Sequence, residues 1–192
     1  YGFKVQSTQP ATVDFHAVIN RRRNLDAGRL DLRIFVVDPS TDAFPVPTDP
    51  TLVAIADGIN RKLAGAGITL GSVTFGGVPT EIEQDTFVID PNVDLNQNGL
   101  ADQAELLFAA TPRDTSVRVL DVFVIQEFLG SAIVGFSGGI PGPTMAPATR
   151  SSGVVVAAFN GFDGNRLDAE AIAHIAAHEA AHQDLARGRA PG

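Results

Sequence analysis

The sequence of 192 residues contains no cysteine, no tryptophan and a single methionine, Met145. The absence of cysteine excludes disulfide bridges and metal sites built on thiolates. Basic residues are also scarce, because 14 Lys and Arg stand against 22 Asp and Glu and the net charge is −8. Such a chain lacks the basic face that binding to nucleic acid requires, so we expect no nucleic-acid partner.

Long apolar runs are missing as well. No stretch approaches the roughly 20 apolar residues that span a bilayer, so we expect no membrane span. The chain begins at Tyr1 rather than Met and shows no signal-peptide pattern, so we expect a processed form or an excised fragment. Apolar residues nevertheless make up 44% of the sequence, which is enough for the core of one domain.

The spacing of apolar side chains predicts both strands and helices. The predicted strands are residues 11–19, 30–38, 71–78, 85–91, 117–128 and 153–159. One predicted helix starts near residue 51 and ends at Gly65 or Gly67, and an Ala-rich helix starts between Asn165 and Asp168. This order indicates an α/β fold with a mixed, twisted sheet, a long backing helix and a C-terminal helix. We expect residues 1–29 to be an appended β segment and residues 30–192 to be the main domain.

The predicted terminal helix contains H-E-x-x-H within AHEAAHQDLARG, residues 177–188. A helix places His178 and His182 one turn apart on the same face, where both imidazoles can bind one Zn²⁺. Glu179 could then activate the water that attacks a peptide carbonyl. Alternatively, the histidines of this Ala-rich helix form an exposed stripe that begins at His174. His174 is no third ligand, because it lies about 12 Å from His182 along the helix axis.

These residues resemble the metzincin zinc endopeptidases, in particular secreted bacterial members near the pappalysin-like group. Besides H-E-x-x-H, the resemblance rests on LDLRIFVVD with LVAIADGINRKLAGAGITL, and on VRVLDVFVIQEF with GFSGGIPGPTMAPATRSSGVVVAAF. It covers roughly residues 30–182. It implies a first strand with its backing helix, strands and a loop that border a substrate cleft, and a secreted endopeptidase that cleaves peptides or proteins. His178 and His182 would be its zinc ligands and Glu179 its catalytic residue.

The sequence departs from this family downstream of His182. The family signature continues H-E-x-x-H-x-x-G-x-x-H, but Leu185 stands at the glycine position and Gly188 at the third histidine. A methionine turn should follow, yet Met145 lies upstream. We expect a chain that is truncated after the H-E-x-x-H helix and weakly active or inactive. A third ligand from upstream, such as His16, is one alternative, and a pseudoprotease or calcium-braced binding module without catalysis is another.

A second metal motif lies at the middle of the chain. Residues 94–105, DLNQNGLADQAE, fit the calcium-loop pattern D-x-[DN]-x-[DN]-G-x₅-E without a mismatch. Gly99 would allow the sharp turn, and two Asn in place of Asp suit calcium-rich surroundings outside the cell. The alternative is an Asn-Gly turn before a helix that Asp102 caps. The expected Ca²⁺ ligands are Asp94, Asn96, Asn98, the Leu100 carbonyl, Asp102 and Glu105.

Overall fold

The structure is a computed structural model that describes residues 28–37, 50–97, 100–111, 119–138, 153–161 and 164–184. Side chains are described only as far as Ala181 in the last range. The predicted strand at residues 11–19 and His16 therefore lie outside the described residues. So do Asn98 and Gly99 of the predicted calcium loop.

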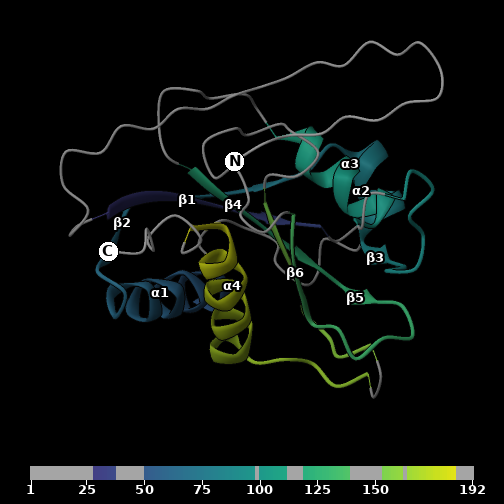
Figure 1. Ribbon diagram of the computed structural model, residues 1–192. Coiled ribbons are helices and arrows are strands. Elements are labelled where there is room, and N and C mark those ends of the chain that lie inside the picture. The colour runs from purple at the N-terminus through teal and green to yellow at the C-terminus, as the bar shows by residue number, and fades with distance from the viewer. Residues whose placement is uncertain are drawn as a thin grey trace, which may run out of the picture.

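Within these ranges the chain forms seven strands and four helices (Figure 1). The strands are β1 (Gly28–Val36), β2 (Ile68–Gly77), β3 (Val88–Ile89), β4 (Val119–Ile125), β5 (Glu127–Phe128), β6 (Gly135–Ser137) and β7 (Val154–Ala157). The helices are α1 (Pro50–Ala64), α2 (Thr80–Thr86), α3 (Asp102–Ala110) and α4 (Ala169–Asp184). None of these helices is long and apolar enough to cross a membrane.

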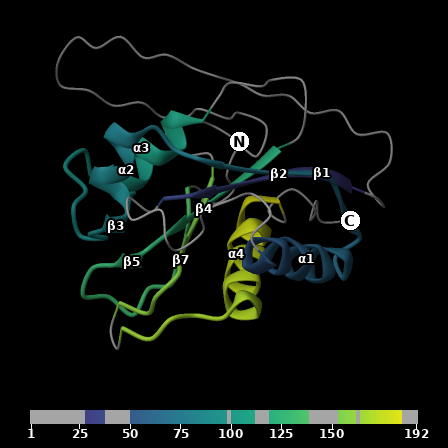
Figure 2. The same cartoon turned by 180° about the vertical axis from the view of Figure 1, so that it is seen from behind.

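The main sheet has five strands in the order β2-β1-β4-β7-β6. The first four run parallel, and β6 runs antiparallel to β7, so the predicted mixed α/β sheet is confirmed. Two further short strands, β3 and β5, pair in parallel and form a separate, smaller sheet. Helices α1 and α4 cover one face of the sheet, and α2 and α3 lie on the other (Figures 1 and 2).

Each face of the sheet has its own core, because successive side chains of a strand point to opposite faces. On β4, Leu120, Val122 and Val124 pack toward α1 and α4, whereas Phe123 and Ile125 pack toward α3. All five are buried, which explains why this segment reads as an almost continuous apolar run. The two cores fix α4 and α3 on opposite sides of the same strands.

Helices α1 and α4 pack very close to each other. A Cβ on Gly58 would lie 2.5 Å from the Cβ of Ala173, so the two helices cross where neither has a large side chain. Two basic residues of α1 also form ion pairs with Glu170 of α4. The carboxylate of Glu170 lies 2.8 Å from Lys62 Nζ and 2.7 Å from Arg61 Nη2. This arrangement holds α4 firmly against the backing helix.

Among the described residues, the predicted elements agree with the structure except around residues 80–91 and 126 and at β6, which was not predicted as a strand. Residues 80–86 form α2, which the sequence pattern did not predict because its only aliphatic side chain is Ile82. The predicted strand at 85–91 is therefore reduced to β3. The predicted strand at 117–128 divides at Gln126, whose backbone N–H donates to the Phe87 carbonyl at 2.7 Å and so joins the chain to the second, smaller sheet.

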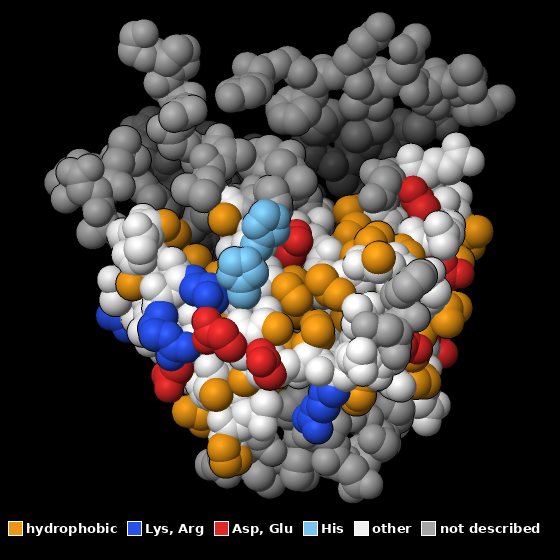
Figure 3. All heavy atoms as spheres, turned by 90° about the horizontal axis from the view of Figure 1, so that it is seen from below, with side chains coloured by type: hydrophobic (Ala, Val, Ile, Leu, Met, Phe, Trp, Pro, Cys, Tyr) orange, Lys and Arg blue, Asp and Glu red, His pale blue; other side chains and the backbone are white. Residues whose placement is uncertain are grey.

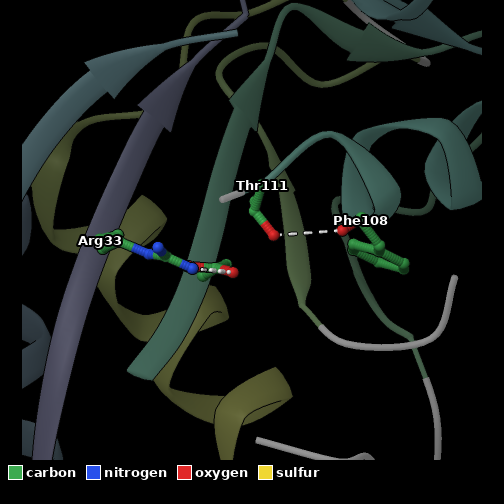
Figure 4. Close-up of polar contacts among 4 residues, drawn as sticks. Arg33, Phe108 and Thr111 are labelled. Atoms are coloured by element: carbon green, nitrogen blue, oxygen red, sulfur yellow. Dashed lines mark hydrogen bonds and ion pairs between the residues drawn. The ribbon is translucent and has the colours of Figure 1, made fainter. Parts of the chain in front are cut away.

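The face that carries α3 also holds a charged pair between the two central strands. Arg33 on β1 donates from Nε to Asp121 Oδ1 at 2.6 Å and from Nη2 to Oδ2 at 2.8 Å (Figure 4). The side chain of Asp121 is 2% exposed and that of Arg33 17%. Arg33 also stacks over the ring of Phe35, at 5.7 Å from the centroid. A bidentate pair of this kind is among the stronger hydrogen-bonded arrangements in proteins.

Candidate metal sites

Helix α4 contains the whole H-E-x-x-H motif, so the predicted helix is confirmed. It begins as the sequence suggests, because the backbone N–H of Ala171 donates to Asp168 Oδ1 at 2.7 Å and so satisfies one free donor of the first turn. One side of α4 packs into the core below the sheet. The buried residues of that side are Ile172, Ala173, Ala176, Ala177 and Ala180.

The motif residues on α4 have different surroundings. His178 is exposed, as is His174 one turn before it, and histidine side chains gather on this surface next to acidic and basic side chains (Figure 3). Glu179 is half-buried. His182 belongs to the helix, so the backbone places it one turn after His178, but its side chain lies outside the described ones.

Glu179 lies directly against the edge strand β6. A Cβ added to Gly135 would be 3.1 Å from Glu179 Cγ and 3.3 Å from Glu179 Oε1, and it would overlap Cγ2 of Ile175. Only a residue without a side chain lets β6 run this close to α4. This role of Gly135 was not predicted from the sequence. Residues 135–137 were not among the predicted strands, so the local sequence carried no signal of this close approach.

The calcium motif folds so that three of its predicted ligand residues meet. Asn96 Nδ2 donates to Glu105 Oε2 at 2.8 Å and to Asp102 Oδ1 at 3.4 Å. The backbone N–H of Leu95 donates to Asp102 Oδ2 at 3.2 Å. Glu105 is 2% exposed, and Asp94 and Leu100 are partly buried. The loop thus turns back over the first turn of α3.

One part of the alternative interpretation, that Asp102 caps the following helix, is wrong, and its Asn-Gly turn lies outside the described residues. The N-cap of α3 is Ala101, and no side chain caps the helix. Asp102 is already the first helical residue, and its carboxylate accepts from the backbone N–H of Leu95 and the side-chain amide of Asn96 in the preceding loop. Both acidic residues of the first turn, Asp102 and Glu105, therefore face the loop.

Among the side chains that the structure describes, no three His, Asp or Glu residues form a group that could hold a metal ion. The side chain of His182 is not among them. A calcium loop also uses amide and backbone oxygens, so two carboxylates beside Asn96 are compatible with that finding. Comparison with known proteins gives no family model that matches the chain and no curated protein that matches it.

Proposed function

We propose that this chain carries the zinc-binding helix of a secreted, zinc-dependent endopeptidase of metzincin type. The observation that carries the proposal is the placement of H-E-x-x-H. The motif lies wholly within α4, whose alanine side packs under the sheet, while His178 is open to solvent and Glu179 lies against β6. The resemblance to metzincins implies a first strand, a backing helix and a motif helix, and the chain has β1, α1 and α4 in that order along its sequence.

The surroundings of Glu179 favour this proposal over a solvated histidine stripe. In a stripe, the polar side chains of α4 would all face water in the same way. His174 and His178 do so, but Glu179 is half-buried between α4 and the backbone of Gly135. Such a position holds the carboxylate beside the sheet edge and restricts its rotamers.

The donor types and their spacing fit a zinc ion. His178 and His182 would hold it, with a third protein ligand from outside the motif, since catalytic zinc sites use three protein ligands. When bound, zinc supplies a Lewis acid that polarises a carbonyl and makes water acidic enough to react near neutral pH. Glu179 would act as the general base that accepts a proton from the attacking water and returns it to the departing amine. A peptide substrate would lie along β6, because Glu179 lies against Gly135 of that strand.

The test is hydrolysis of unfolded casein by the whole chain in buffer with trace zinc. Glu179→Gln should lower the rate by about 100-fold or more, since general bases contribute about 10²–10⁴. The control is His174→Ala, which changes an exposed histidine of the same helix and should leave the rate unchanged. Hydrolysis that persists in Glu179→Gln would contradict the assigned role. Bound zinc without any hydrolysis would favour the alternative, a pseudoprotease or binding module.

A further inference from the structure

We propose a calcium site in the loop of residues 94–105, separate from the zinc helix and on the opposite face of the sheet. Two independent observations support it. The sequence places oxygen-bearing residues at all the positions that a calcium loop requires. The fold then brings the third, ninth and twelfth of those positions together at Asn96, Asp102 and Glu105.

The centre of the site is marked by the amide of Asn96. Its Nδ2 group carries partial positive charge and lies between the carboxylates of Asp102 and Glu105, at 3.4 Å and 2.8 Å. A cation placed between the same two carboxylates would satisfy both. Rotation of the Asn96 amide by half a turn presents Oδ1 at that place, which is the contribution that the third position of a calcium loop makes.

The burial of Glu105 gives the site its chemical preference. Glu105 is 2% exposed, and a buried carboxylate is costly unless strong partners compensate it. Glu at the twelfth position of a calcium loop binds through both oxygens, so a divalent cation would compensate this buried charge strongly. The ligands of this site are hard oxygens, which suit Ca²⁺ and exclude soft metals.

The loop is already held at both ends. The backbone N–H of Asp102 donates to the Val93 carbonyl at 2.9 Å. Gln103 accepts from the Asp90 N–H at 2.8 Å and donates to the Val88 carbonyl at 3.1 Å. A calcium ion would tie the loop between these anchors to the first turn of α3. It would thereby brace the helix that carries Phe108 into the core.

The expected affinity is modest. Three carboxylates and two neutral amides give the loop less charge than loops with Asp at positions three and five. We expect a Kd of about 10⁻⁴–10⁻³ M, the range of extracellular calcium modules.

The test is the thermal unfolding midpoint of the whole chain after chelator treatment, measured with added calcium chloride. The midpoint should rise as calcium reaches about 10 mM, tenfold above the weakest Kd expected here. Glu105→Gln should weaken the response at least tenfold. Glu81→Gln, which changes an exposed acid of α2, should respond like wild type. If Glu105→Gln does not fold, Asp102→Asn takes its place, because Asp102 is only partly buried.

Three results would overturn the calcium site. One is a wild-type midpoint that calcium does not raise. Another is an equal rise with magnesium, which demands stricter octahedral geometry and keeps its waters. The last is an undiminished response in the variant of Glu105 or Asp102 that folds. His178→Ala should leave the calcium response intact, so the zinc and calcium proposals can fail separately.

Discussion

Replacement of Gly135 by alanine tests the contact that places Glu179. The new Cβ would be 3.1 Å from Glu179 Cγ and would overlap Cγ2 of Ile175, whereas relaxed carbon atoms are separated by about 3.5–4.0 Å. Gly135 is not among the residues with positive φ, so an alanine there meets no backbone strain. The effect of the substitution is therefore steric, and either β6 or α4 must move.

The matched control is Gly76→Ala at the opposite edge of the sheet. Gly76 also lacks positive φ, and its added Cβ would be 3.7 Å from the ring of Phe35, an ordinary contact. Alanine at such a position stabilises by about 0.4–1 kcal/mol through the unfolded chain. Overpacking at Gly135 should instead cost about 1–3 kcal/mol. The two variants should therefore differ by roughly 1.5–4 kcal/mol in their free energies of unfolding.

Urea denaturation followed by circular dichroism measures this difference, provided that the slope of the transition is unchanged. Gly135→Ala should unfold at a lower urea concentration than wild type, and Gly76→Ala at an equal or higher one. If the two glycine variants are equally stable, β6 does not pack against α4 at Glu179 as described.

Three further outcomes follow from other contacts. Asp121→Ala should cost about 3–5 kcal/mol in the free energy of unfolding, because it leaves Arg33 without its bidentate partner. Joint replacement with Asp121→Leu and Arg33→Met should cost much less. Equal losses of the two variants in urea denaturation would contradict this reasoning. Asp168→Ala should cost about 0.5–2 kcal/mol by removing the N-cap of α4, and an unchanged urea midpoint would contradict that role. Hydrogen bonds from Lys62, the larger effect, and from Arg61 hold the pKa of Glu170 below its ordinary 4.5. Their stabilising effect is therefore present above pH 4.5 and is lost as the pH falls through the lowered pKa. Glu170→Gln should accordingly lower the thermal midpoint less at about pH 3 than at about pH 7, and an equal effect at both would contradict the pairing.

Much of the fold could be predicted from the sequence. Helical spacing from Leu52 to Leu63 predicted α1, and apolar runs predicted β1, β4 and β7. These elements bury large apolar side chains, so their periodicity is strong. The short helix α2 could not be predicted, because its stability comes from packing of Ile82 and from the hydrogen bond of Thr86 Oγ1 to the Ile82 carbonyl rather than from a pattern.

The candidate sites could be predicted only as far as their spacing along the chain. The positions of His178, His182 and Glu179 within one helix follow from local sequence, as does the spacing of the oxygen-bearing residues in 94–105. The contact of Glu179 with Gly135 joins segments 44 positions apart, since 179 less 135 is 44, and depends on the antiparallel edge strand. The direction of the Asp102 carboxylate into the loop likewise depends on tertiary structure, and capping preference alone had suggested the opposite.

The measurement that tests the central claim most directly is the zinc content of the purified chain, by elemental mass spectrometry after dialysis against trace zinc. Zinc near one ion per chain should be retained in wild type and in His174→Ala, and lost in His178→Ala and His182→Ala. The claim would be contradicted by a wild-type chain without zinc. Loss of zinc from His174→Ala with retention in His182→Ala would also contradict it, because the metal would then belong to the exposed histidine pair rather than to H-E-x-x-H.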